Sequence, residues 1–227
     1  KSGVVAELSG DVPAVGESCK KAAELAINEI NESGGVKVAG TYHLLRLVIE
    51  DGQGKADAST AAAGRLIDQE GVLAIIGPNV SNGAVPAAAV AEAKKVLLVS
   101  PWSTAPRLTK DDTGKTRRFV YRACYSDEFQ ARSLAKFATG YIKAAKVAIL
   151  YNPASEAPKA QAELMKKELE ARGAQVVAME TYAAGTTDYS AQMKKIAEAS
   201  PDLVYLPSYY VEVPEQLRQA RAAGVKA

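Results

Sequence analysis

The chain has 227 residues, of which 48% are hydrophobic and 24% charged, so it can bury one large core or two smaller ones. Its 28 basic and 26 acidic residues are interleaved, which argues against binding nucleic acid or a membrane surface through bulk charge. Cys19, Cys124 and the single histidine, His43, lack the spacing of a metal or dithiol site. We therefore expect no cofactor, no metal and no nucleic-acid partner, and we leave open whether the cysteines are bridged.

Short apolar runs alternate with helical patterns from end to end. The runs predict strands at residues 3–6, 44–49, 72–76, 96–99, 119–122, 147–150, 176–179 and 203–206. Helical spacing fills the intervals, and the last helix is expected to begin at Pro214. Continuous apolar strands joined by helices are typical of parallel sheets buried on both faces, so the fold class is α/β. Eight such units favour more than one sheet, with a closed eightfold barrel as the alternative.

The clearest helical pattern follows the fifth predicted strand. Leu134, Phe137, Ala138, Tyr141 and Ile142 recur at i, i+3, i+4, i+7 and i+8. This spacing predicts one buried apolar face.

Polar residues follow several predicted strands. They are Ser9 after the first, Asn79 and Ser81 after the third, Trp102, Ser103 and Thr104 after the fourth, Asp127 after the fifth, and Tyr209 and Tyr210 after the last. Hydroxyls beside the free amides of a helix start suit a carboxylate, and an acidic residue opposite would hold an ammonium group. A structural alternative makes Ser81 and Asp127 helix N-caps, with Asp127 and Gln130 forming a capping box.

Signatures of enzyme active sites are missing from the sequence. There is no GxGxxG after the first strand, no GxSxG and no HExxH, and Thr109 stands where a phosphate-binding loop ending at residues 114–116 needs glycine. The remaining enzymatic alternative is a hydrolase or lyase that uses Glu7, Asp11 or Asp127. We expect a binding protein and not an enzyme.

Five segments in order resemble one family across the whole chain: residues 4–10, 26–36, 76–81, 100–106 and 187–190. The chain is similar to type I periplasmic solute-binding proteins, and most similar to the leucine/isoleucine/valine-binding proteins of ABC importers. The resemblance implies two Rossmann-like α/β lobes, 1–122 and 123–227, joined by a hinge, which close on an amino acid or similar small carboxylate.

The same resemblance implies a membrane permease as partner, a periplasmic or extracytoplasmic mature protein whose signal peptide is removed, and a monomer at full length. A ligand-sensing domain of a receptor or regulator is the alternative. Since members of the family continue beyond the point that matches residues 223–227, the second lobe is expected to be incomplete here.

Carried over by position, the resemblance implies that the ligand is bound by Ser81, Trp102, Ser103, Thr104, Asp127 and Tyr209. The hydroxyls of Ser81 and Thr104, with the backbone at 102 and 104, would hold the carboxylate and ammonium ends. Trp102, Val15 and Glu156 depart from the branched-chain pattern, so the side chain of the ligand is left open.

Overall fold

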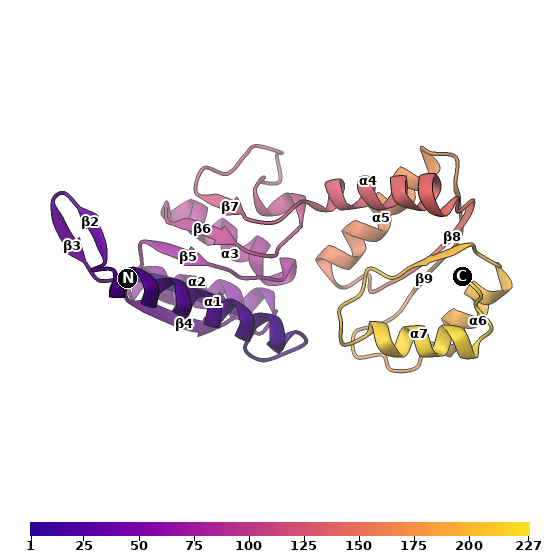
Figure 1. Ribbon diagram of the computed structural model, residues 1–227, viewed down its shortest axis with the longest axis horizontal. Helices are drawn as coiled ribbons and strands as arrows, with labels where there is room; N and C mark the ends of the chain where they lie inside the picture. The colour runs from indigo at the N-terminus through magenta and orange to yellow at the C-terminus, as the bar shows by residue number, and fades with distance from the viewer. The chain divides into compact units, whose positions relative to one another are not determined.

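The computed structural model describes residues 1–227, which divide into two compact units, Lys1–Cys124 (unit 1) and Tyr125–Ala227 (unit 2) (Figure 1). The boundary expected from the resemblance, after residue 122, lies just before this division. Each unit has its own sheet and its own buried clusters of apolar side chains.

Unit 1 is built on a five-stranded parallel sheet. In spatial order its strands are β4 (Leu47–Asp51), β1 (Ser2–Ala6), β5 (Ala74–Ile76), β6 (Leu97–Ser100) and β7 (Val120–Arg122). All four ladders are parallel. The carboxyl ends of the five strands therefore meet at one edge of the sheet.

Three helices cover both faces of this sheet: α1 (Pro13–Glu32), α2 (Ala56–Asp68) and α3 (Ser81–Lys94). Val4 and Ala6 of β1 pack with Ala23 of α1, whereas Val5 between them packs in the cluster formed by α2 and α3. Successive residues of a strand point to opposite faces, so a strand covered on both sides must be apolar throughout. Burial of each aliphatic side chain contributes about 1.5–3 kcal/mol.

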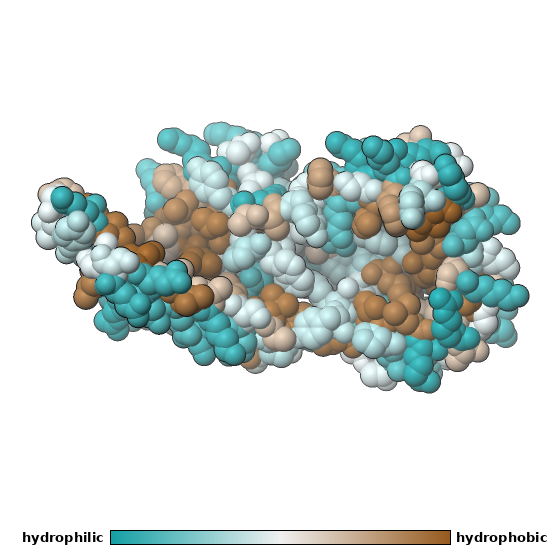
Figure 2. Space-filling model, in the orientation of Figure 1, coloured by the Kyte–Doolittle hydropathy of each residue, from teal (hydrophilic) through white to brown (hydrophobic).

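A small antiparallel hairpin, β2 (Val36–Val38) and β3 (Thr41–His43), precedes β4 and was not predicted. The strand expected at residues 44–49 in fact begins at Leu47, and His43 belongs to the hairpin. The apolar side chains of the hairpin are exposed, and Figure 2 shows apolar surface at the end of unit 1 that carries the hairpin. The run at residues 44–49 that suggested one strand thus contains three residues outside any strand, followed by the first three residues of β4.

Unit 2 contains a three-stranded parallel sheet in the order β10 (Leu203–Tyr205), β8 (Lys146–Tyr151) and β9 (Gln175–Thr181). Its helices are α4 (Asp127–Phe137), α5 (Glu156–Glu170), α6 (Ser190–Glu198) and α7 (Val213–Ala222). Val147 and Ile149 of β8 pack in the α4 and α5 cluster, whereas Ala148 and Leu150 pack in the α6 and α7 cluster. The central strand is again buried on both faces.

The apolar face expected around α4 is wrong in its second half. After Phe137 the helix continues as a π-helical turn, η2 (Ala138–Ile142), in which each turn takes up more residues. Phe137, the last residue of α4, is 50% exposed and Tyr141 is 78% exposed, with their rings stacked 5.1 Å apart, while Ala138 is buried. Alanines, not the aromatic residues, form the buried side of this segment.

The chain is α/β with two separate open parallel sheets, so the expected fold class is confirmed and the closed barrel is wrong. No helix is long and apolar enough to cross a bilayer. No three histidine, cysteine or acidic side chains gather as metal ligands, and no disulfide joins Cys19 to Cys124.

Candidate ligand-binding site

The carboxyl edge of the unit 1 sheet gathers the loops that follow β1, β4, β5 and β6. Six polar residues on these loops or at the adjoining ends of β6 and α3 are 9% exposed or less: Glu7, Asn79, Ser81, Ser100, Ser103 and Thr104. Buried polar groups are costly unless they find hydrogen-bond partners. Their mutual contacts define the site.

Three serines join the loops after β5 and β6. The Ser100 hydroxyl donates to the Pro78 carbonyl oxygen at 2.6 Å and accepts the Ser103 amide at 3.1 Å. The hydroxyls of Ser81 and Ser103 lie 3.0 Å apart in a mutual hydrogen bond. The sequence-predicted residues Ser81 and Ser103 are therefore in direct contact.

Ser81 is the first residue of α3 and not its N-cap. Val80 occupies the cap position, with no side-chain cap bond, so the structural alternative for Ser81 is wrong. The first turn of α3 contains no acidic residue. Since the amides and dipole at a helix start favour negative charge, the Ser81 hydroxyl lies where a carboxylate is stabilised.

Trp102 and Thr104 lie in the same loop as Ser103 but differ in exposure. Thr104 is 9% exposed, whereas Trp102 presents 39% of its surface. A half-exposed indole beside buried hydroxyls offers a flat apolar surface.

The loop after β6 accepts hydrogen bonds from residues that the sequence did not single out. Arg122, at the end of β7, donates from Nη1 to the Ser103 carbonyl oxygen at 3.2 Å and from Nη2 to Thr109 Oγ1 at 3.0 Å. The Cys124 thiol donates to the same Ser103 carbonyl at 3.4 Å. Cys124 is partly exposed. An arginine at a strand end carries no motif, so only the fold reveals its role.

Glu7, at the end of β1, is fully buried and faces the loop after β5. Its Oε1 accepts the amides of Asn79 at 2.9 Å and Val80 at 3.1 Å, and its Oε2 accepts Asn79 Nδ2 at 2.7 Å. Burial raises the pKa of Glu7 by more than these hydrogen bonds lower it. Asp11, also named in the enzymatic alternative, is exposed, so the two carboxylates have very different surroundings.

Ser9 and Asp51 are hydrogen-bonded to each other at the carboxyl ends of β1 and β4. The Ser9 hydroxyl donates to Asp51 Oδ2 at 2.6 Å, and Oδ1 accepts the Leu8 and Gln53 amides at 3.0 and 2.8 Å. Burial raises the pKa of Asp51, but the hydrogen bonds together outweigh it, and the net shift is downward. Ser9 therefore joins the loops after β1 and β4.

Asp127, in unit 2, is the first residue of α4 and is fully buried. The N-cap is Ser126, whose hydroxyl accepts the Phe129 amide at 3.4 Å, so the capping box of Asp127 with Gln130 is wrong. Asp127 Oδ1 accepts Gln161 Nε2 at 2.9 Å, and Gln161 Oε1 accepts the Tyr205 hydroxyl at 3.3 Å. This chain of contacts ties α4 and α5 to the end of β10.

Tyr209 lies in the segment between β10 and α7, as expected. Its amide donates to Glu212 Oε2 at 3.0 Å, and its carbonyl accepts the Glu212 and Val213 amides at 3.0 and 3.2 Å. The ring is partly buried, while the neighbouring Tyr210 is 47% exposed. These backbone bonds lead directly into α7.

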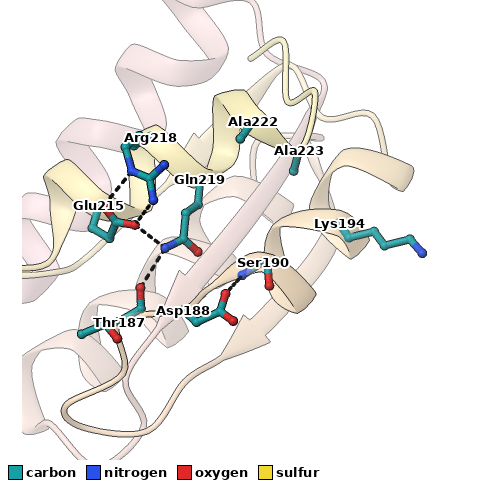
Figure 3. Close-up of a pocket in the computed structure, with 9 residues that line it drawn as sticks. All are labelled: Thr187, Asp188, Ser190, Lys194, Glu215, Arg218, Gln219, Ala222 and Ala223. Carbon is teal, nitrogen blue, oxygen red and sulfur yellow. Dashed lines mark hydrogen bonds and ion pairs between the residues drawn. The ribbon is translucent and has the colours of Figure 1, made fainter.

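A separate hollow of unit 2 lies between α6 and α7 and contains none of the predicted ligand-binding residues. Figure 3 shows Thr187 and Asp188, ahead of α6, facing Glu215 and Gln219 of α7. Gln219 Nε2 donates to the Thr187 carbonyl at 2.8 Å and to Glu215, and Asp188 Oδ1 accepts the Ser190 amide at 3.0 Å. Hydrogen bonds lower the pKa of Glu215 to about 2, and the bond from Arg218 contributes more than the bond from Gln219. These hydrogen bonds join Thr187 and the start of α6 to α7 or to each other, which explains the 187–190 segment as a structural feature.

Comparisons with known proteins connect this arrangement to one family. The model of the periplasmic binding protein family matches residues 1–227. A curated relative, Leu/Ile/Val-binding protein homolog 3 of Brucella melitensis, is 31% identical over 225 residues, which cover 99% of this chain and 58% of that protein.

Two solved structures are similar over almost the whole chain. A leucine-binding protein from Thermotoga maritima has a TM-score of 0.87 at 28% identity, covering 100% of this chain and 61% of the other. The branched-chain amino acid transporter substrate-binding protein of Streptococcus pneumoniae, solved with isoleucine, also has a TM-score of 0.87, at 29% identity, covering 99% and 61%. The chain thus spans about three-fifths of the length of the proteins it matches.

Proposed function

The chain belongs to the periplasmic binding protein family, and from that membership we propose that it captures an amino acid for an ABC importer. This is a family of substrate-binding proteins and not of enzymes. The relatives named for leucine, isoleucine and valine support an amino acid as the ligand class. Delivery to a membrane permease, an extracytoplasmic location and a monomeric state are parts of the same proposal.

One observation carries the proposal for this chain: the Ser81 and Ser103 hydroxyls, 3.0 Å apart, lie at the start of α3. We assign the ligand carboxylate to these hydroxyls and to the first amides of α3. Thr104, in the same loop, completes this group of donors. Hydrogen bonds to a charged carboxylate contribute about 1.5–3 kcal/mol each, so two or three suffice to orient a small ligand.

Trp102 is the residue we assign to the side chain of the ligand. Its exposed indole offers an apolar or aromatic surface beside the carboxylate donors. In unit 2, Tyr209 and Asp127 are assigned to the ligand from the family resemblance, Asp127 toward the ammonium group.

Isothermal titration calorimetry of the purified protein tests the proposal. The titrants are the twenty L-amino acids, beginning with leucine and isoleucine. We expect saturable heat with at least one of them and recovery of that amino acid unchanged. Absence of binding across the panel would contradict the proposal, and chemical conversion of a bound amino acid would favour an enzyme instead.

A further inference from the structure

The buried carboxylate of Glu7 contacts the residues that precede Ser81 in the proposed carboxylate site. Glu7 is 0% exposed. A Cβ at Gly16 of α1 would overlap the Glu7 carbonyl, and one at Gly54 would lie 3.8 Å from Glu7 Cγ. The Glu7 carboxylate accepts hydrogen bonds from the loop after β5.

The donors that the Glu7 carboxylate accepts from other residues are neutral and belong to that loop. They are the backbone amides of Asn79 and Val80 and the side-chain amide of Asn79. These two residues immediately precede Ser81, and Val80 is the N-cap of α3. The carboxylate thus fixes the backbone from which the Ser81 hydroxyl and the first amides of α3 project.

We propose that Glu7 is a positioning residue for ligand binding: its carboxylate holds Asn79 and Val80 so that Ser81 and the start of α3 meet the ligand carboxylate. The inference rests on the proposed function for its consequence in binding. The clamp, by which we mean the hydrogen bonds from the Asn79 and Val80 amides to Glu7, does not depend on the proposed function.

Burial disfavours the charged form of Glu7 relative to its neutral form. Burial raises its pKa above the usual value despite three hydrogen bonds, because no cation compensates the charge among its bonded partners. The titratable group facing it is the Cys19 thiol of α1, whose pKa is raised by burial and further by the Glu7 charge. A neutral isostere should therefore fold at least as well and yet bind less well.

Four variants of the full chain test the proposal. Glu7→Gln retains the shape and removes the charge, and Asn79→Asp places two carboxylates together. The double variant Glu7→Gln/Asn79→Asp restores a carboxylate facing a carboxamide with the roles exchanged. Glu92→Gln is the matched control, because Glu92 also accepts two backbone amides, those of Arg118 and Phe119, at 2.9 and 2.8 Å, away from the proposed site.

The readouts are the Kd for L-leucine, the melting temperature at neutral pH, and the NMR shifts and hydrogen exchange of the Asn79 and Val80 amides. We expect Glu7→Gln to weaken leucine binding by about fivefold or more without lowering the melting temperature. The double variant should recover most of the affinity, Asn79→Asp should not, and Glu92→Gln should leave the Kd unchanged. The Val80 and Asn79 amides should exchange faster in Glu7→Gln.

The outcomes separate this inference from the proposed function. Unchanged leucine affinity with a lower melting temperature in Glu7→Gln would overturn the positioning role. If the unmodified protein does not bind leucine, the amide exchange decides: faster exchange in Glu7→Gln supports the clamp, and unchanged exchange and shifts overturn it.

Discussion

Thr104 is the residue where the proposed binding role separates most clearly from a structural one. It is 9% exposed and follows the hydrogen-bonded Ser103 in the loop after β6. We expect Thr104→Ala to weaken amino-acid binding about ten- to a hundredfold, because a charge-assisted hydrogen bond to the ligand is lost. Calorimetry gives the Kd, and thermal unfolding of the ligand-free protein should change by no more than about 2 °C.

Thr60→Ala is the matched control for that prediction. The Thr60 hydroxyl donates to the Ala56 carbonyl within α2, away from the proposed site. It should leave the affinity unchanged. A fall in melting temperature for Thr104→Ala with an unaltered Kd would assign Thr104 to the fold.

The raised pKa of Glu7 predicts how stability depends on pH. A carboxyl group with a raised pKa in the folded state takes up a proton on folding, so its contribution to stability is greatest below its unfolded pKa of about 4.5. That contribution is lost as the pH rises through the folded pKa. We therefore expect the melting temperature of Glu7→Gln, relative to the unmodified protein, to increase between about pH 4 and pH 7.

Glu92→Gln should give a pH dependence of opposite sign. Burial raises the pKa of Glu92, but the Arg118 and Phe119 amides and the neighbouring arginines outweigh it, and the net shift is downward. Its stabilisation is present above the unfolded pKa and is lost as the pH falls. Melting curves across the same pH series measure both variants, and parallel curves for Glu7→Gln and the unmodified protein would contradict the account of Glu7.

At the scale of elements, the N-cap of α4 can be tested by mutation. Ser126, and not Asp127, caps this helix by accepting the Phe129 amide. We expect Ser126→Ala to lower the free energy of unfolding by about 0.5–2 kcal/mol, the usual cost of losing an N-cap. Gln130→Ala should cost less than about 0.5 kcal/mol in urea denaturation, and an equal loss would restore the capping box.

The strands were predictable because each central strand is buried on both faces and is therefore apolar throughout. β1 and β8 show this directly, since consecutive residues pack into different clusters. The hairpin and the outward orientation of Phe137 and Tyr141 were missed because the apolar residues there are exposed. Periodicity reports which residues are apolar, and it cannot distinguish Tyr141 on a surface from Leu134 against a core.

The site was predictable in part for a related reason. Ser81, Ser103 and Thr104 follow strands, and parallel strands bring their carboxyl ends to one edge, so their proximity could be anticipated. Glu7 and Arg122 were not recognised as supports, because their roles depend on which loop each one faces. The side-chain contacts of Asp127 with Gln161 likewise depend on the packing of α4 on α5.

At the scale of the whole molecule, two α/β units each carry a separate sheet and core, as the sequence indicated. Unit 1 supplies the hydrogen-bonding edge assigned to the ligand carboxylate, with Trp102 beside it. Unit 2 carries Asp127 and Tyr209, which remain assigned to the ligand by resemblance. The central claim is that the Ser81 and Ser103 edge recognises a carboxylate.

The most direct test compares L-leucine with L-leucinamide, which keeps the side chain and ammonium group but replaces the carboxylate with a neutral amide. Calorimetry of the purified protein should show saturable binding of leucine and at least about a hundredfold weaker binding of leucinamide, because the charge that the hydroxyls and the start of α3 stabilise is absent. Equal affinity for the two compounds would contradict carboxylate capture at this edge of the sheet.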